Sequence, residues 1–257
     1  MRKLLSLLPA LLLLLNTTQA QRARFISSGT IEYEKTVNMK ALVKKIMDND
    51  QSTSAQALLQ TQNGQAQFKV LKSTLVFNVE KALFTPIAPE TMASGGIFNT
   101  PMSDQVNTVY TDFGTRTNVI QKNVNDVLLL VKDSVQKIKW KLTNETREIA
   151  GYPCRRANGL LLDSVYVVAF YTDKIPVSGG PEWFGGLSGM ILEIAIPHEN
   201  VTWIAKKIND VKVAASTIVA PKKGKAMNNK QLYEFLKTVT GRYEAKQAAL
   251  IIKGFLL

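Results

Sequence analysis

The sequence predicts a mainly β protein, a β-rich α+β fold built on a single curved antiparallel sheet that resembles half a barrel and ends in a helix. Short segments with an apolar residue at every second position recur along most of the chain, and this period is typical of half-buried strands. Helical spacing of apolar residues is confined to residues 40–47 and 228–250. Strands at intervals of about ten residues predict roughly nine to eleven strands in a meander. The alternative architecture is a β-sandwich.

The N-terminus has the pattern of a signal peptide. Arg2 and Lys3 precede an apolar run over residues 4–15, and Ala20 closes a small-residue cleavage site. The apolar run is too short to cross a bilayer, because a spanning helix needs about 20 apolar residues. We expect residues 1–20 to be a removed signal peptide and residues 21–257 to form a single β-rich domain. The alternative is an uncleaved anchor.

The composition narrows the classes of function. The net charge is +12, and from residue 205 onward eleven Lys and Arg residues face three acidic ones. Such a surface can bind acidic partners or lipid headgroups, and the favoured alternative is a solvated surface that only keeps the protein in solution. Nucleic acid is not expected as a partner, because the protein is exported and has no basic–aromatic recognition motif. An exported chain with one cysteine, Cys154, contains no internal disulfide and depends on packing for stability.

The first half of the chain alternates strands and loops. Residues 28–39 predict a strand and residues 40–47 one or two helical turns. In residues 67–84 the period slips near Ser73, which indicates two strands joined there by a turn or a bulge. Further strands are expected at 106–112, 117–122 and 127–133. Surface loops are expected at 48–67 and at the proline-containing residues 85–104, where a loop of this length is often functional.

The second half continues the sheet. Residues 137–142 place Ile138 and Trp140 opposite three lysines, as in an edge strand guarded by charge. Residues 146–157 predict two strands joined by a tight turn at Gly151, and Asn158–Gly159 indicates a loop. Strands are also expected at 164–172, 190–196 and 202–213, the first of them buried on both faces. The C-terminal amphipathic helix at 228–250, interrupted near Gly241, is expected to pack on its own domain, with peripheral membrane contact as the alternative.

The segment 176–197 contains five glycines and three prolines. Its glycines, at positions 179, 180, 185, 186 and 189, suit a backbone nest that binds an anion. They equally suit a tight connection that Trp183 and Phe184 fasten to the core. The second interpretation is favoured, because the segment lacks the Gly-Lys-Ser/Thr sequence of a phosphate-binding loop and leads into a strand.

Three stretches of the chain resemble the GLPGLI family of exported proteins from Bacteroidetes. They are Ile149-Ala-Gly-Tyr-Pro-Cys-Arg-Arg-Ala157, Tyr171-Thr-Asp-Lys-Ile-Pro176 with Gly180-Pro181, and Gly186-Leu-Ser-Gly-Met-Ile191. The positions that match the family pattern are Gly151, Tyr152, Cys154, Ala157, Tyr171, Pro176, Gly180, Pro181, Gly186, Leu187, Gly189 and Ile191.

Two positions depart from the pattern of this family. Ser188 stands where the family has proline, and Met190 stands where it has leucine. The resemblance implies a β-rich fold and a location in the periplasm, at the outer membrane or outside the cell. It also implies a role near outer-membrane transport systems, and it supplies no catalytic, cofactor-binding or metal-binding residue.

A few side chains could carry chemistry, each with a structural alternative. Arg155 and Arg156 could lower the pKa of the Cys154 thiol, although a buried structural thiol is favoured and the one histidine, His198, is the only candidate imidazole base. His198 and Glu199 could begin a metal site, with Met190 or Met102 as a further ligand, but zinc normally takes four ligands. Three carboxylates flank the glycine-rich segment and could act as an acid–base pair. They are Asp173, Glu182 and Glu193.

The sequence therefore favours a non-enzymatic envelope protein that binds a ligand or a partner and needs no cofactor. A small apolar ligand would occupy a concavity lined from the strands of Phe77, Val168 and Ile194. One alternative is an accessory partner of a TonB-dependent type outer-membrane transporter, bound through basic residues such as Lys222, Lys223 and Lys225. A second alternative is a metal-binding envelope protein, and a third is a hydrolase or redox enzyme that uses Cys154.

Overall fold

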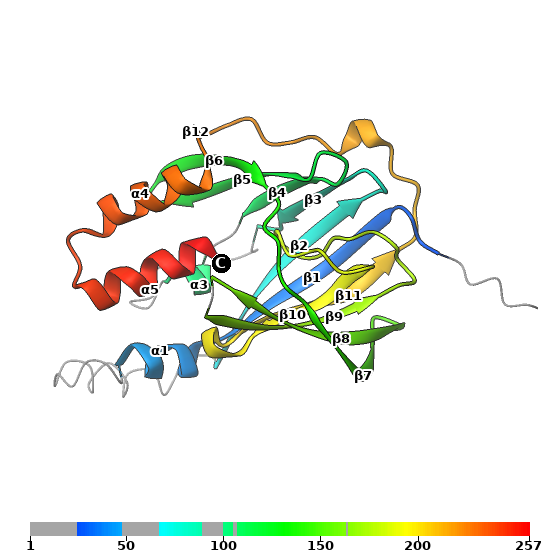
Figure 1. The fold of residues 1–257 in the computed structure, drawn as a ribbon, viewed down its shortest axis with the longest axis horizontal. Helices are drawn as coiled ribbons and strands as arrows, with labels where there is room; N and C mark the ends of the chain where they lie inside the picture. Colours follow the sequence, from blue (N-terminus) through cyan, green and yellow to red (C-terminus); the bar gives the residue numbers. More distant parts are fainter. Residues whose placement is uncertain (1–24, 48–66, 89–99, 105–106, 163) are drawn as a thin grey trace, which may run out of the picture.

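In the part of the chain that the structure describes, twelve strands form one open sheet in the order β12-β6-β5-β4-β3-β2-β1-β11-β10-β9-β8-β7 (Figure 1). The computed structural model describes residues 25–47, 67–88, 100–104, 107–162 and 164–257. The strands are β1 (Gly29–Asn38), β2 (Phe68–Phe77), β3 (Lys81–Pro86), β4 (Thr108–Asp112), β5 (Thr117–Val124), β6 (Val127–Ser134), β7 (Lys141–Ile149), β8 (Tyr152–Leu161), β9 (Val165–Thr172), β10 (Met190–Ile196), β11 (Val201–Asn209) and β12 (Lys225–Met227). The helices are α1 (Met39–Met47), α3 (Pro101–Asp104), α4 (Asn229–Thr240) and α5 (Ala245–Leu256), with 3₁₀ turns η2 (Pro197–Glu199) and η3 (Ala215–Thr217).

The predicted fold class is confirmed, because the protein is mainly β with one curved sheet and helix at its C-terminal end. The sheet has more strands than expected. The β-sandwich alternative is wrong, because a sandwich needs two sheets and all the strands belong to one. The predicted signal peptide at 1–20 and most of the predicted loop at 48–67 lie outside the described residues. No helix within the described ranges is long and apolar enough to cross a membrane.

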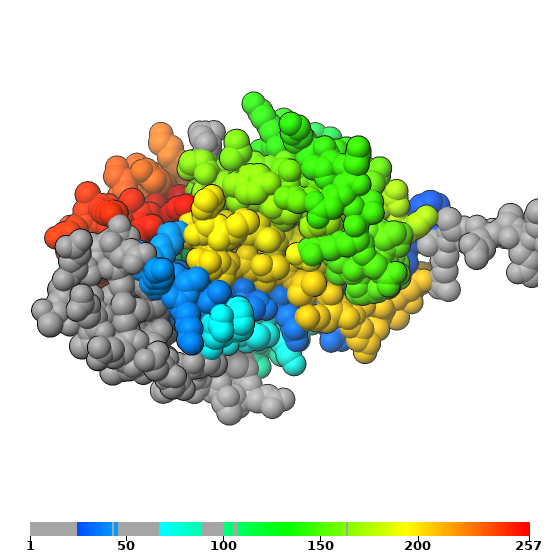
Figure 2. Space-filling view, turned by 90° about the horizontal axis from the view of Figure 1, so that it is seen from below, coloured from blue at the N-terminus to red at the C-terminus, as the bar shows by residue number. Residues whose placement is uncertain are grey.

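Strand β1 is the centre of the sheet. It pairs antiparallel with β2 on one side and with β11 on the other. The strands from β2 to β6 form one meander, and those from β7 to β11 form a second. Figure 2 shows β1 (blue) on the outer surface between β2 (cyan) and the yellow strands of the second meander. The short strand β12 adds to β6 in parallel, so the last part of the chain borders the first meander.

The glycine-rich segment fills the concave side of the sheet. The side chains of Trp183 and Phe184 are buried and stacked with ring centroids 4.7 Å apart, and Phe184 lies 5.9 Å from the ring of Trp203 on β11. These rings join a core of inward-facing strand residues, among them Ile31 and Tyr33 of β1. The interpretation of this segment as a tight connection fastened by Trp183 and Phe184 is therefore confirmed.

The C-terminal helices form a second, smaller core on β5 and β6. Leu232, Leu236 and Phe255 pack there against Leu129 and Val131. The predicted helix is two helices, because α4 ends at Thr240, before Gly241, and α5 begins at residue 245. At the start of α4 the Asn228 side chain accepts a hydrogen bond from the Gln231 amide in a capping box, which fixes where this helix begins. Packing on its own domain is thus confirmed for this region.

Some predicted boundaries in the first half of the chain were wrong. Strand β2 runs through Ser73 without a break, and the turn lies at residues 78–80, where Asn78 Oδ1 accepts hydrogen bonds from the amides of Glu80 and Lys81. The region 85–104, expected to be an irregular loop, contains the short helix α3, while residues 89–99 lie outside the description.

The stretch expected to be an edge strand begins as an unpaired extended segment. Strand pairing starts only at Lys141, and before it Trp140 donates a hydrogen bond from Nε1 to the Gly185 carbonyl at 3.0 Å. Asn158–Gly159 is not a loop either, because β8 passes through it. A Cβ on Gly159 would lie 2.8 Å from Ile138 Cγ2, so this glycine lets Ile138 pack on the strand. The turn at Gly151 is confirmed, with positive φ angles of 51° at Ala150 and 82° at Gly151.

Candidate functional site

Three charged side chains are buried on the concave side. Lys35 comes from the inward face of β1, Lys122 from β5 and Glu182 from the glycine-rich segment. Asn107 Nδ2 donates a hydrogen bond to Glu182 Oε2 at 3.0 Å. Lys122 Nζ donates one to the Phe255 carbonyl at 2.6 Å, near the C-terminal end of α5. A buried charge is tolerated when it has such partners, and a cation is favourable at a helix C-terminus.

Burial shifts the pKa values of all three groups. It lowers the pKa of Lys35 to about 8 and that of Lys122 to about 8, although the negative charge of Glu182 opposes both shifts. Burial also raises the pKa of Glu182, against the opposing effect of the two lysines. Perturbed groups of this kind often mark functional sites. Beside Lys122, however, the structure has a pocket with room for about one water molecule, so this cluster joins the sheet to α5 rather than receiving a ligand there.

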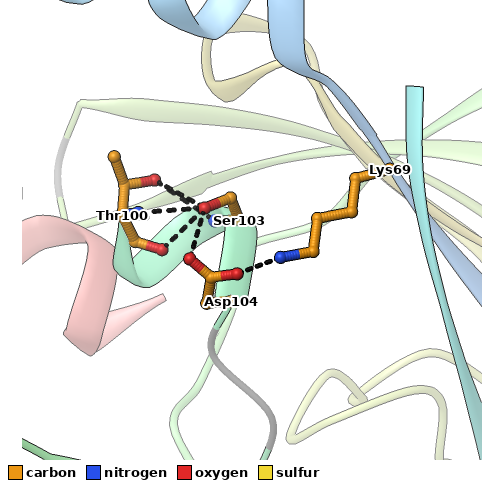
Figure 3. Close-up of polar contacts among 4 residues, drawn as sticks. All are labelled: Lys69, Thr100, Ser103 and Asp104. Atoms are coloured by element: carbon orange, nitrogen blue, oxygen red, sulfur yellow. Dashed lines mark hydrogen bonds and ion pairs between the residues drawn. The ribbon is translucent and has the colours of Figure 1, made fainter. Parts of the chain in front are cut away.

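A second polar group lies next to α3 (Figure 3). Ser103 Oγ lies 2.9 Å from Asp104 Oδ2, and Asp104 forms an ion pair with Lys69 of β2. Serine, acid and lysine in contact would suit a nucleophile, but Ser103 is fully buried and its Oγ accepts a hydrogen bond from the Thr100 amide at 2.9 Å. The hydroxyl therefore caps the first turn of α3, and the ion pair ties that turn to the sheet.

Cys154 is a structural residue. Its side chain is buried, and its Sγ donates a weak hydrogen bond to the Tyr152 carbonyl at 3.4 Å. Burial raises the pKa of the thiol to about 12, with the positive charge of Arg147 as the main opposing effect. Since the thiolate is the reactive form, this cysteine is poorly suited to be a nucleophile, and His198 lies at the surface on η2.

The other predicted carboxylates are separated and partnered. Glu193 pairs with Arg147, Asp173 with Arg155 at 3.3 Å, and Glu182 with Asn107. They do not form the acid–base pair considered from the sequence. Glu199, considered as a metal ligand, is buried and holds two lysines instead. In the parts of the chain that the structure describes, no three side chains of His, Cys, Asp or Glu come together as a metal site.

Glu199 is the centre of a clamp between three elements. Its Oε2 lies 2.9 Å from Lys45 Nζ of α1, and its Oε1 lies 2.6 Å from Lys253 Nζ of α5. Figure 2 shows α1 (blue), η2 (yellow) and the C-terminal helices (red) meeting at one end of the molecule. The clamp therefore holds α5 at Lys253, in addition to the hydrogen bond from Lys122 to the Phe255 carbonyl.

The glycine-rich segment is not an open nest for an anion. Its amides bond within the segment, such as Ile191 N to the Gly179 carbonyl at 2.8 Å and Gly186 N to Ser178 Oγ at 3.1 Å. A Cβ on Gly189 would overlap the Thr172 carbonyl, and Gly186 has a φ of +88°. Gly186 and Gly189 therefore lie in a closely packed turn.

The expected apolar concavity does not form from the residues named for it. Phe77 and Ile194 are fully buried within the packed core. Val168 is half-buried and alternates with the buried Val167 and Ala169, so it faces the other side of the sheet. The inner face is occupied by the chain's own side chains, which corrects this prediction.

A groove of about 400 Å³ lies at the helical end of the molecule. One wall is the connection from β8 to β9, including Leu162, and the other is the α4–α5 hairpin, including Tyr233 and Ile252. The lining is mostly apolar, and Leu162 and Tyr233 are each 44% exposed. Sequence reasoning missed this groove because its walls are far apart in the chain and no motif marks them.

Comparisons with known proteins give a family and a fold. The sequence model of the family described as "N-glycanase peptide, N-terminal domain" matches residues 93–234. No curated protein matches the chain.

Two solved structures of PNGF-II, in different crystal forms, share 14% identity with this chain at a TM-score of 0.50. The likeness covers 81% and 79% of this chain. At this identity it shows the fold alone, and the chain spans about a third of the length of PNGF-II, 32% and 31% in the two structures. An uncharacterized conserved protein from Thermus thermophilus covers 80% of this chain and 93% of its own, with 5% identity and a TM-score of 0.39. Because the family match covers more than half of the residues, the chain belongs to the family of N-glycanase peptide N-terminal domains.

Proposed function

We propose that this protein is an exported cell-envelope protein that binds a partner macromolecule and catalyses no reaction. The packing of the concave side carries this proposal. The glycine-rich segment, its two aromatic rings and the buried charges occupy the space where a sheet of this shape would hold a small ligand. Partner binding then takes place on the outer surfaces, and the groove beside α4 and α5 is a suitable one.

Export and location are part of the same proposal. The basic, apolar and small residues at positions 2–20 support a signal peptide. The three sequence stretches described above support a place in the GLPGLI family as well, with a location in the periplasm, at the outer membrane or outside the cell.

An envelope protein with an acidic surface, such as a subunit of an outer-membrane transporter, is the partner that the charge favours. From residue 205 onward the chain has eleven basic and three acidic residues, so association should be fast and sensitive to salt. Reversal of Lys222, Lys223 and Lys225 to glutamate together should weaken association if this basic segment takes part. An unchanged association would exclude the segment.

The experiment is gentle purification of the protein from its own envelope fraction, followed by native mass spectrometry and chemical crosslinking. We expect the mass of a chain that begins near Gln21, without a stoichiometric small molecule. Crosslinking should give an adduct with one envelope protein. A stoichiometric lipid, metal or small molecule would overturn the proposal in favour of a ligand carrier.

Recognition of glycoproteins is a second candidate, favoured by the match to the N-glycanase domain family. It predicts binding to an N-glycosylated protein that is lost when the same protein is deglycosylated. Isothermal titration calorimetry with the glycosylated and the deglycosylated protein tests this candidate. Equal binding heats for the two forms would show that the glycan is not the recognised group.

A further inference from the structure

The connection between β6 and β7 is an extended segment that presents its backbone to solvent. In the described part of the chain, no backbone N–H or C=O group of residues 136–140 takes part in a hydrogen bond. The segment is fixed at both ends, because Val135 N donates a hydrogen bond to the Arg116 carbonyl at 2.9 Å and Lys141 pairs with Asn158 of β8. Figure 1 shows this connection (green) on its way from β6 to β7. It offers free donors and acceptors, as the edge of a sheet does.

Side-chain packing holds this segment in place without using its backbone groups. Ile138 and Trp140 are half-buried against the main core. A Cβ on Gly159 would lie 2.8 Å from Ile138 Cγ2 and 3.0 Å from Trp140 Cε3, so both side chains lie directly on β8. Trp140 Nε1 also donates a hydrogen bond to the Gly185 carbonyl at 3.0 Å. A strand that binds here would meet a preformed edge, so that little conformational entropy of this chain is lost on binding.

Three exposed lysines alternate with these two anchoring residues. They are Lys137, Lys139 and Lys141. None of the three forms an ion pair with another described residue, and residues 136–142 contain no acidic residue. Because side chains alternate along an extended chain, the lysines lie on one side of it and follow one another at about 7 Å. The free backbone is therefore accompanied by a regular row of positive charge.

This row of charge determines which strand can pair with the segment. Side chains directly opposite each other on paired strands interact, and like charges at such positions are destabilising whereas opposite charges are stabilising. A second copy of the segment would bring lysine opposite lysine and is disfavoured. A strand with a carboxylate at every second position has the same spacing as the lysines, so it would place one acidic side chain opposite each of them.

We infer that residues 136–141 bind an extended, acidic segment of the partner protein by strand addition. The partner's backbone pairs with the free N–H and C=O groups of residues 136–140, and its carboxylates face the three lysines. In this mode of recognition the main-chain hydrogen bonds give affinity and the alternate side chains give specificity. The inference rests on the proposed function and specifies the partner's chemistry.

The test uses the mature full-length chain and a short fluorescent peptide in which glutamate alternates with threonine. Fluorescence anisotropy should show binding that weakens as salt is raised. One control peptide has lysine in place of each glutamate, and a second keeps the glutamates but is methylated on its backbone amides. Both controls should bind at least about tenfold more weakly, the first through charge repulsion and the second through lost main-chain hydrogen bonds. Equal binding of either control would overturn the inference.

Two matched variants locate the binding. The first combines Lys137→Glu, Lys139→Glu and Lys141→Glu. It should bind the acidic peptide more than about tenfold more weakly than the native chain. The second changes the net charge by the same amount on another exposed segment, by combining Lys222→Glu, Lys223→Glu and Lys225→Glu. It should leave binding within about twofold, because exposed charges at a distance are screened. Equal circular dichroism spectra and melting temperatures show that both variants are folded. Equal weakening in the two variants would mean that net charge alone attracts the peptide, which would overturn the inference.

Other occupants and the proposed function give distinct results. Sedimentation with phosphatidylglycerol vesicles that is lost in the first variant, without binding of the acidic peptide, would replace the peptide with a lipid surface. If the native chain gives no crosslinked adduct in its envelope fraction, the proposed function fails, whatever the peptide does. If the native chain and the first variant give the same adduct in equal amount, partner binding stands and the assignment to residues 136–141 fails. Loss of the adduct in the first variant alone would support both.

Discussion

Glu182 is the buried carboxylate that faces two buried lysines, Lys35 and Lys122. At pH 7 both lysines are protonated, since the pKa of each is about 8. Replacing Glu182 with glutamine would keep the shape of the side chain and remove the negative charge. Because an uncompensated buried charge is costly, Glu182→Gln should lower the free energy of unfolding at pH 7 by about 3 kcal/mol. Urea unfolding measures this loss, and Glu80→Gln, at an exposed position, is the control.

The same variant should show a defined dependence on pH. The folded-state pKa of each lysine, about 8, lies below the ordinary value of 10.5. The unfolded chain therefore binds more protons between these two values, and the lysines make stability rise with pH across that window. Once the lysines are neutral they no longer need the carboxylate, so the loss caused by Glu182→Gln should be smaller at a pH of about 10 than at pH 7. A loss of equal size at both pH values would contradict the coupling of Glu182 to the lysines.

Gly151 and Gly189 should respond differently to replacement by alanine. A methyl group on Gly189 would overlap the Thr172 carbonyl, whereas Gly151 has open space around it and a φ of +82°. Gly151→Ala should therefore cost only the conformational strain, about 1 kcal/mol. Gly189→Ala must move the backbone and should cost more than about 2 kcal/mol. Denaturant midpoints of the two variants decide the order, and a smaller loss for Gly189→Ala would contradict the packing described.

At the scale of elements, the clamp around Glu199 fixes two helices at once. Glu199→Gln should leave α1 and α5 less firmly held, because the buried carboxylate pairs with Lys45 and Lys253. We expect faster amide hydrogen exchange in α1 and α5 and a loss of stability of about 2 kcal/mol, because the carboxylate is buried while the two lysine side chains are partly exposed to water. Exchange in β4, which pairs with β3 and β5, serves as the internal reference.

The matched control is a surface ion pair on the same helical hairpin. Glu234 lies 3.1 Å from Lys237, with both side chains more than half exposed. Pairs of this kind contribute about 0.5 kcal/mol, so Glu234→Gln should change exchange and stability little. Equal effects of the two substitutions would mean that Glu199 does not position the helices.

Most strands were predictable because one face of each is buried. Apolar residues at every second position in the sequence indicate such a strand. Predictions failed where a neighbour distant in sequence decided the outcome. Ile138 and Trp140 alternate like strand residues, yet both pack against Gly159 of β8, and Trp140 donates a hydrogen bond to the Gly185 carbonyl. Gly159 has the composition of a loop, but its lack of a side chain makes room for Ile138. The turn at Asn78 depends on hydrogen bonds to its side chain, and the alternation of apolar and polar residues gives no sign of them.

The site was less predictable than the fold for the same reason. The burial of Lys35 could have been read from its place between Tyr33 and Val37 on the apolar face of β1. Its proximity to Glu182 and Lys122 requires the tertiary structure, as does the groove between Leu162 and α5. Sequence patterns describe the face of each element, whereas such sites arise between elements.

At the scale of the whole molecule, the continuous sheet should unfold in one step. Trp203 belongs to β11 and Trp140 hydrogen-bonds to the glycine-rich segment just before β7, so their fluorescence reports on the β7–β11 meander, whereas Trp183 lies beside β5 and β6. Far-UV circular dichroism reports on both meanders. Because β1 is hydrogen-bonded to both of them, the two signals should give coincident thermal transitions. Separated transitions would show that the meanders are independent domains.

The position of β1 between β2 and β11 also determines the order in which the chain can fold. Residues 29–38 leave the ribosome early, but their partner strand comprises residues 201–209. The loop between these two strands has to close before the β1–β11 pair contributes any stability. Refolding should therefore be slow for a chain of this size, on the order of milliseconds to seconds. During synthesis one hydrogen-bonding edge of β1 stays without its β11 partner until residues 201–209 have been made, so a chaperone that shields β1 would act longer here than on a protein with a local fold.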